Sequence, residues 1–172
     1  MQTRLLNQAE EAIARQVFEN ELPYKKIRLA DYYLPGNKGV PVTLAAGAGL
    51  LPFLRSLTRY TIYFGPVAFA DGADAPDFRN TLIHELTHVW QGHHSHFAWE
   101  YMVKSMLSQG HALLTTGDRN NAYTYKPGKS WDDYNVEQQA SIVADWFADG
   151  MRGQDVDDRF TYIVNNIRAG HN

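Results

Sequence analysis

Apolar positions with helical spacing dominate the two ends of the chain. In residues 2–19 they fall three or four apart, which predicts an amphipathic helix that Pro23 stops. The same spacing predicts helices over about 97–108, 133–149 and 156–167. The last of these is expected to bury Phe160, Ile163, Val164 and Ile167.

Shorter alternating stretches predict strands in the first third of the chain. Residues 26–32 and 40–44 alternate briefly, and residues 60–64 combine β-branched and aromatic side chains. Pro66 follows the last stretch and favours an edge position for that strand. The glycine-rich residues 45–49 lack a following Gly-Lys-Ser/Thr, so they are interpreted as a connection. The pattern predicts an α+β fold, mainly helical, with a small β-sheet ahead of a central helix.

That central helix is predicted from about residue 76 to residue 91. Asp74 can cap it, Pro76 suits its first turn, and Gly92 is expected to end it. Its apolar side chains surround a small polar group, which indicates a mostly buried helix. These apolar residues are Leu82, Ile83, Leu86, Val89 and Trp90.

The polar group is a His-Glu-x-x-His motif formed by His84, Glu85 and His88. Residues four apart on a helix share a face, so both imidazoles can bind one Zn²⁺. Residue frequencies give roughly 0.01 accidental matches in a chain of this length, so the motif is informative. A buried carboxylate and two buried histidines also need a partner, which a metal supplies.

Composition narrows the possible chemistry. The 172 residues, 44% hydrophobic and 20% charged, suit one globular domain over residues 1–172. A net charge of −3 without a basic block argues against nucleic acid or an anionic membrane as the main partner. The absence of cysteine leaves histidine and carboxylate as metal ligands.

We expect neither a signal peptide nor a membrane-spanning helix. No apolar stretch reaches the length of a signal-peptide core or of a membrane-spanning helix. We therefore expect no membrane insertion and a cytoplasmic protein, with export by a route that needs no cleaved signal left open.

A catalytic zinc site needs a third protein ligand, and the sequence offers two candidates. Glu137 lies on the predicted helix after a long polar stretch, although it also belongs to a polar stripe at helical spacing. His94 follows His88 by the spacing used when the third ligand comes directly along the chain. That arrangement calls for glycine at position 91, where this chain has Gln91. Glu137 is the favoured candidate and His94 the alternative.

These residues carry a resemblance to the zincin metallopeptidases, specifically the Glu-zincin (gluzincin) branch. Residues 84–91 (HELTHVWQ) and 137–140 (EQQA) also resemble a small bacterial group called Vgr-related proteins, HExxH domains associated by name with type VI secretion spike proteins. The resemblance implies a minimal zincin-like domain with Zn²⁺ on His84, His88 and Glu137. Many Glu-zincins carry aspartate four residues after the ligand glutamate, where this chain has Ser141.

The implied activity is hydrolysis of peptide bonds in a peptide or protein substrate. Glu85 would take a proton from a zinc-bound water and pass it to the leaving amine. Tyr123, Tyr125 and Tyr134 are candidates for stabilising the oxyanion. The strand at residues 60–64 is expected to pair with an extended substrate.

Two other interpretations remain open. In one, zinc stabilises a non-catalytic binding or adaptor module with a spike protein as partner. In the other, the same hydrolytic chemistry belongs to a toxic effector with a paired immunity protein. A structural zinc site has no need of Glu85, which favours hydrolysis.

Overall fold

The computed structural model describes the whole chain except residues 36–38, 48–56, 73–74, 96–121 and 172. The helix predicted over 97–108, the Asp74 cap and most of the polar stretch before residue 130 lie outside the described residues. Along the chain the elements are β1 (Thr3–Leu5), α1 (Gln8–Phe18), a 3₁₀ turn (Tyr24–Lys26), β2 (Ile27–Ala30), β3 (Val42–Ala46), β4 (Arg59–Tyr63), α2 (Pro66–Asp71), α3 (Pro76–His94), a 3₁₀ turn (Trp131–Asp133), α5 (Val136–Ala148), α6 (Arg159–Tyr162) and a π-helical turn (Ile163–Ile167).

The described strands form a four-stranded mixed sheet in the order β1-β2-β4-β3. β2 and β4 are parallel, whereas the outer pairs β1–β2 and β3–β4 are antiparallel. The α+β expectation, with a small sheet ahead of the central helix, is confirmed. The expected edge position of β4 is wrong, because β4 lies between β2 and β3. Pro66 comes after the strand, at the start of α2, where it interrupts no pairing.

The N-terminal helix starts later than its apolar spacing suggests. Residues Thr3–Leu5 pair with β2 as a strand, and α1 begins only at Gln8. The cause is a capping box, in which the Asn7 side chain accepts from the Glu10 N–H and the Glu10 carboxylate accepts from the Asn7 N–H. The prediction of one helix over residues 2–19 is therefore wrong for residues 2–7.

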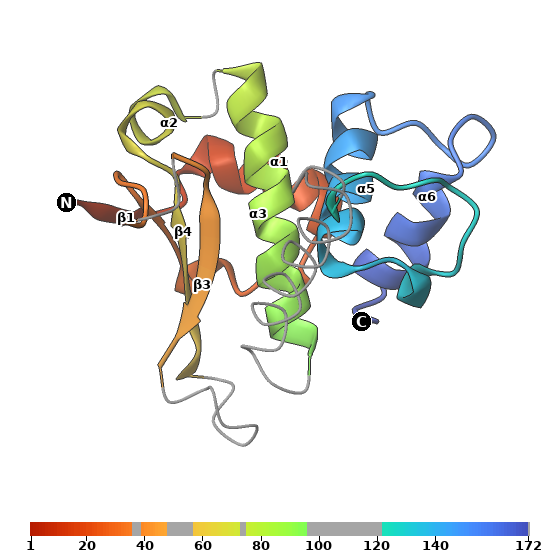
Figure 1. The fold of residues 1–172 in the computed structure, drawn as a ribbon, viewed down its shortest axis with the longest axis horizontal. Helices are drawn as coiled ribbons and strands as arrows, with labels where there is room; N and C mark the ends of the chain where they lie inside the picture. The colour runs from red at the N-terminus through yellow and green to blue at the C-terminus, as the bar shows by residue number, and fades with distance from the viewer. Residues whose placement is uncertain (36–38, 48–56, 73–74, 96–121, 172) are drawn as a thin grey trace.

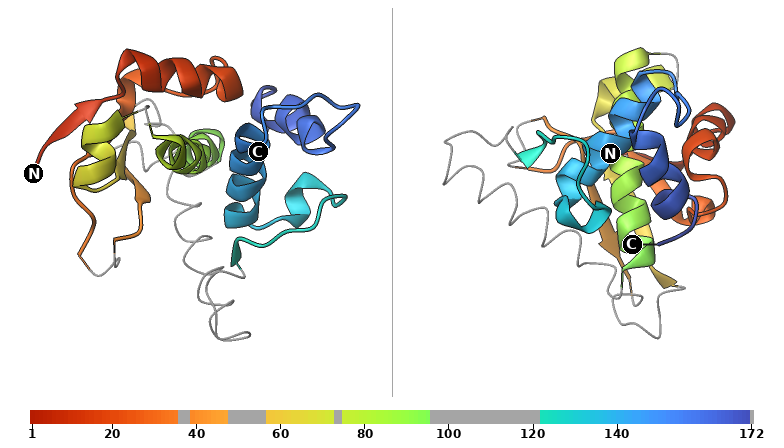
Figure 2. Two further views of the ribbon diagram at one scale, coloured as in Figure 1. Left: turned by 90° about the horizontal axis from the view of Figure 1, so that it is seen from above. Right: turned by 90° about the vertical axis from the view of Figure 1, so that its right-hand side faces the viewer.

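α3 runs through the middle of the fold, with the sheet on one side and α5 and α6 on the other (Figures 1 and 2). Its expected apolar positions are completely buried: Leu82, Ile83, Leu86, Val89 and Trp90. The helix continues past Gly92 to His94, contrary to the predicted end. It is closed instead by Ser95, whose hydroxyl donates to the Gln91 carbonyl oxygen at 2.6 Å.

The C-terminal helices are shorter than predicted. α5 starts at Val136 because Asn135 caps it, with Gln138 completing a second capping box. The segment predicted as one helix over 156–167 consists of α6 and a π-helical turn. Ile163 and Ile167 are buried as expected, but Val164 is 39% exposed, because the helix packs on the core through its other face. No helix in the described ranges is long and apolar enough to span a bilayer.

Candidate metal centre

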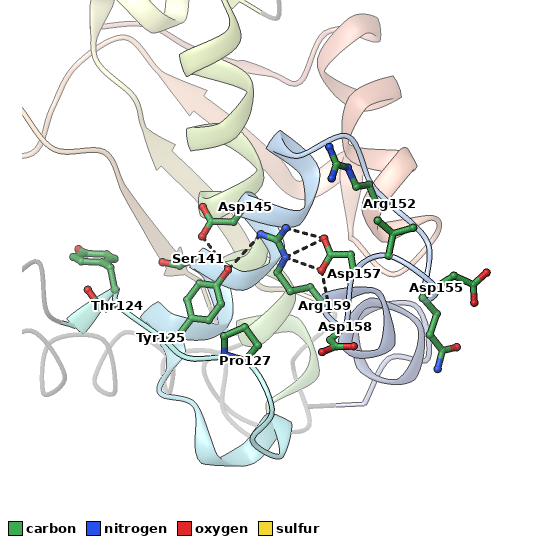
Figure 3. Close-up of a pocket in the computed structure, with 13 residues that line it drawn as sticks. Thr124, Tyr125, Pro127, Ser141, Asp145, Arg152, Asp155, Asp157, Asp158 and Arg159 are labelled. Atoms are coloured by element: carbon green, nitrogen blue, oxygen red, sulfur yellow. Dashed lines mark hydrogen bonds and ion pairs between the residues drawn. The ribbon is translucent and has the colours of Figure 1, made fainter.

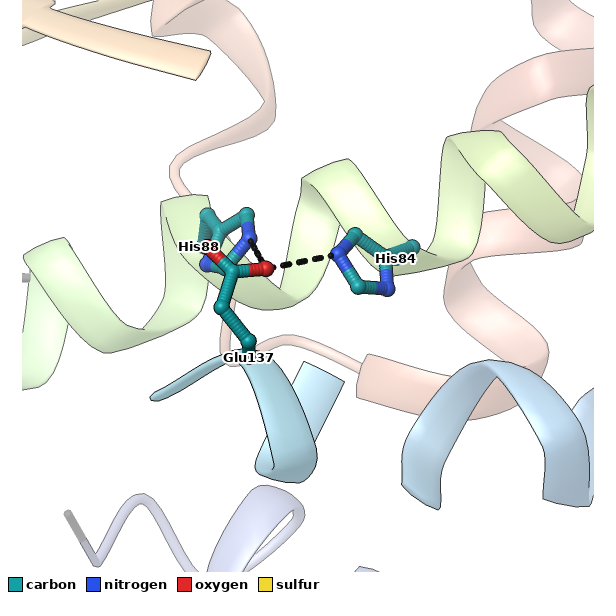
Figure 4. A group of neighbouring side chains, drawn as sticks. All are labelled: His84, His88 and Glu137. Atoms are coloured by element: carbon teal, nitrogen blue, oxygen red, sulfur yellow. Dashed lines mark hydrogen bonds and ion pairs between the residues drawn. The ribbon is translucent and has the colours of Figure 1, made fainter. Parts of the chain in front are cut away.

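Three side chains from two helices meet at the interface between α3 and α5. His84 and His88 lie one turn apart on α3, and Glu137 projects from the first turn of α5 (Figure 4). Glu137 Oε2 lies 3.3 Å from His84 Nε2 and 3.4 Å from His88 Nε2. One ligand atom from each residue lies within 4.8 Å of the others. The structure thus brings Glu137, the favoured third ligand, to both histidines.

The spacing of these atoms fits a metal of the size of zinc. Bonds of about 2.0–2.1 Å at tetrahedral angles separate two ligand atoms by about 3.3–3.4 Å. The two measured carboxylate–imidazole distances fall at this value. The donor set of two imidazoles and one carboxylate is also a known catalytic zinc set. His84, the most exposed of the three at 18%, marks the side from which solvent reaches the group.

The charges of the buried group are strongly coupled. Burial would lower the pKa of His88, but the Glu137 carboxylate outweighs burial and raises it. Burial would likewise raise the pKa of Glu137, but His88 and His84 hold it well below its usual range. The Glu137 carboxylate and the His88 imidazole thus favour each other's charged forms. With both histidines neutral, the Glu137 carboxylate would offset one of the two positive charges of Zn²⁺.

Glu85 contacts the sheet through β3. Its side chain is 5% exposed, and its Oε2 accepts a hydrogen bond of 2.6 Å from the Thr43 hydroxyl on β3. The carboxylate therefore stands beside the two histidines in sequence without joining the group of three ligand atoms.

His94, the alternative third ligand, points toward α1. Its Nδ1 donates to the Trp90 carbonyl oxygen at 2.9 Å, and its Nε2 lies 3.2 Å from Glu21 Oε2. Its ring stacks on the indole of Trp90. These contacts give His94 a structural role at the end of α3.

Gln91 supports His88 in a way that the sequence analysis missed. His88 Nδ1 donates to Gln91 Oε1 at 2.8 Å, which leaves Nε2 as the nitrogen that faces Glu137. The Gln91 amide donates in turn to the Val136 carbonyl and to Gln139 Oε1, both at 2.9 Å. Since a residue three after His88 shares its helix face, the spacing was a readable signal.

Ser141, at the position where many Glu-zincins carry aspartate, does not support a histidine in the way that Gln91 does. Ser141 and Asp145 line a surface hollow of about 900 Å³ (Figure 3), and Asp145 accepts from the Tyr125 hydroxyl at 3.0 Å. Glu137 itself is only 2% exposed, so the polar stripe on α5 does not describe a solvated face at that position.

We expect Gln91→Met to weaken zinc binding by roughly 10–100-fold, the usual effect of losing a partner of a metal-bound histidine. Methionine fills a similar volume but cannot accept from His88 Nδ1. A competitive titration against a chromophoric chelator measures the change. Gln16→Met, on the exposed face of α1, is the matched control and should bind zinc like the parent. Parental affinity in Gln91→Met would contradict the assigned role of Gln91.

The three candidate tyrosines occupy different places. The Tyr123 ring lies 5.8 Å from the His84 ring, centre to centre, on the open side of the group. Tyr125 bonds Asp145 and contacts Arg159 in the hollow of Figure 3. The Tyr134 hydroxyl donates to the Lys126 carbonyl at 2.7 Å, and its residue is buried. Of the three, Tyr123 is the one that contacts a residue of the histidine–glutamate group.

Comparison with known proteins identifies a relative of this chain. No family model matches the chain. The chain is 31% identical over 174 residues to the type VI secretion system spike protein VgrG2b of Pseudomonas aeruginosa, a match that covers 98% of this chain. The solved structure of the effector domain of VgrG2b matches with a TM-score of 0.62 and 28% identity, covering 93% of this chain and 83% of that one. The chain is a homologue of the VgrG2b effector domain.

The relation to VgrG2b concerns one part of a much larger protein. The chain spans 15% of the length of the spike protein, whereas it covers most of the effector domain solved on its own. Because the sequence match takes in nearly the whole chain, α3 and α5 with the three ligand candidates lie within it. The similarity to the VgrG2b effector domain thus rests on both sequence and fold.

Proposed function

We propose that this chain is a zinc-dependent metallopeptidase of the zincin type. One observation carries the proposal: the fold brings Glu137 to the two histidines of the HExxH motif, at the ligand separations of a tetrahedral zinc ion. Glu85 is kept out of that group and next to it, where a hydrolase needs a base.

Five residues have a role in this proposal. Zn²⁺ on His84, His88 and Glu137 would polarise the scissile carbonyl and increase the acidity of water. Glu85 takes a proton from the attacking water and delivers it to the nitrogen of the leaving amine, so it ends each cycle deprotonated. Tyr123, on the open side of His84, is the tyrosine whose position suits an oxyanion contact.

The edge of the sheet offers a place for the substrate backbone. Within the described strands β3 is the edge beside α3, and its Thr43 contacts Glu85. An extended peptide that added to β3 would pass close to Glu85. This replaces β4, which is paired on both sides.

We further propose that the peptidase acts as a type VI secretion effector. The support is the homology to a domain described as the effector domain of a spike protein. In this role the chain would travel with a spike protein and, in the producing cell, meet an immunity protein. The alternative of a metal-stabilised adaptor shares the spike partner but requires no hydrolysis.

Zinc content and hydrolysis test the proposal together. The purified protein should contain about one zinc per chain, as a mononuclear site requires. Removing the metal with a chelator should abolish cleavage of fluorescently labelled casein and lower the unfolding temperature, since metal-binding energy is also folding energy. Adding one equivalent of Zn²⁺ should restore both.

Zinc content and casein cleavage, measured together, distinguish a peptidase from a metal-stabilised adaptor. Zinc bound at one per chain without cleavage of casein or of a broad peptide library would favour the adaptor. A protein that holds no transition metal after reconstitution would contradict both.

A further inference from the structure

A polar side chain occupies a core-facing position on the edge strand. Along β3 the burial alternates, so Thr43 and Ala45 face inward toward α3 while Val42 and Leu44 are more exposed. Thr43 is 2% exposed. Valine has nearly the same shape and would fill such a position without a hydroxyl that needs a buried partner.

The hydroxyl of Thr43 has its partner in Glu85. Its Oγ1 lies 2.6 Å from Glu85 Oε2, the length of a hydrogen bond from a hydroxyl to a charged carboxylate. The same Oγ1 also lies 3.2 Å from the Glu85 backbone oxygen. Hydroxyl and carboxylate are both buried, so the contact is held without competition from bulk water.

We infer that Thr43 is a positioning residue that holds the Glu85 carboxylate in the orientation in which it acts as base. The inference deepens the proposed function and rests on it. By donating to Oε2, Thr43 leaves Oε1 as the oxygen that takes the proton from water and returns it to the leaving amine. Thr43 keeps its own proton throughout and forms no bond to the substrate.

The position of the contact makes this role more than local packing. The two residues are 42 apart in the chain, and their hydrogen bond ties the sheet edge to the helix that carries both histidines. A misplacement of about 1 Å at a catalytic group can cost up to about 10²-fold in rate. A free Glu85 side chain could swing through such a distance by changing rotamer.

The test compares Thr43→Val, which removes only the donor, with Thr43→Ser, which keeps it. On zinc-loaded protein with labelled casein, Thr43→Val should lower kcat by about 10-fold or more, with KM and zinc affinity near the parental values. Thr43→Ser should recover most of kcat. Parental kcat in Thr43→Val, or an equal loss in Thr43→Ser, would overturn the inference.

A matched control is available on α3. Thr87 is fully buried, but its hydroxyl donates to the Ile83 carbonyl oxygen of the same helix. Thr87→Val therefore removes a buried hydroxyl close to the site without touching Glu85, and kcat should stay parental. An equal loss of kcat in this variant would mean that any buried hydroxyl near the motif has the same effect, and would overturn the inference.

A second readout does not depend on activity. Urea unfolding of the parent, Thr43→Val, Glu85→Ala and the double variant gives a double-mutant cycle in which each single change removes the contact. Non-additive free energies of unfolding support the contact, whereas additive ones overturn it. If the parent cleaves nothing, the proposed function fails, and the cycle still decides whether Thr43 holds Glu85.

Discussion

Replacing Glu137 with alanine is expected to weaken zinc binding by about 10²-fold or more, because even partners of ligands contribute 10–100-fold. In the proposed site the carboxylate would be one of three ligands and would carry negative charge that compensates the metal. Glu137→Gln, which keeps the volume and removes the charge, should also bind zinc weakly while preserving the packing of α5.

His94→Ala is the matched control for this loss. The His94 ring nitrogens form hydrogen bonds with the Trp90 carbonyl and with Glu21, away from the proposed zinc site. Removal of the ring should therefore leave zinc affinity close to that of the parent. Competitive titration of all four proteins gives the comparison. Loss of zinc in His94→Ala, with retention in Glu137→Ala, would point to a three-histidine site and contradict the assignment.

Glu85→Gln is expected to reduce casein cleavage by roughly 10²-fold or more while zinc affinity stays near normal. Glutamine is nearly isosteric and can still accept from Thr43, but its amide cannot take a proton from water. Because Glu85 is not among the three ligand residues, the metal should remain in place.

The rate of Glu85→Gln must be compared at equal zinc occupancy. Glu21→Gln makes the same chemical change at a carboxylate that pairs with His94, and its rate should match the parent. A Glu85→Gln protein that cleaves casein at the parental rate would show that another group is the base.

The ligand candidates were readable from the sequence for definite physical reasons. Helical geometry places His84 and His88 on one face wherever the helix lies, and a chain without cysteine leaves few donors to complete the site. Glu137 lies 53 residues from His84, yet its place in the first turn of a helix after a long polar stretch made it a candidate. Its distance from the histidines came only with the packing of α5 on α3.

The contacts that support the site residues could not be predicted from local sequence patterns. Thr43 meets Glu85 across 42 residues, and Gln91 meets Gln139 across 48, so both depend on which elements pack together. The order of the strands likewise depends on contacts between distant parts of the chain. Pro66 suggested an edge for β4, but strand order follows from pairing over the whole sheet, which places β3 at the edge.

Some errors, in contrast, came from local signals that were present but not used. Asn7 and Glu10 have the spacing of a capping box, which marks the true start of α1. Asn135 and Gln138 repeat the pattern at the start of α5. Apolar periodicity alone extended both helices too far toward the N-terminus.

Contacts from two sides, the sheet and α5, hold the residues of the site in place. The sheet holds Glu85 through Thr43, and α5 holds His88 through Gln91 while it contributes Glu137 itself. A shift of β3 would therefore displace Glu85, the proposed base, whereas a shift of α5 would displace the proposed metal ligands. This division predicts that variants of Thr43 change kcat and variants of Gln91 change zinc affinity.

The most direct measurement is a crystal structure of the zinc-loaded protein with anomalous data collected at the zinc edge. We predict one strong anomalous peak per chain, bonded to Nε2 of His84 and of His88 and to the Glu137 carboxylate, with the fourth position open to water and Glu85 beside it. A peak at another cluster, or a fourth protein ligand that closes the site, would contradict a catalytic zinc centre.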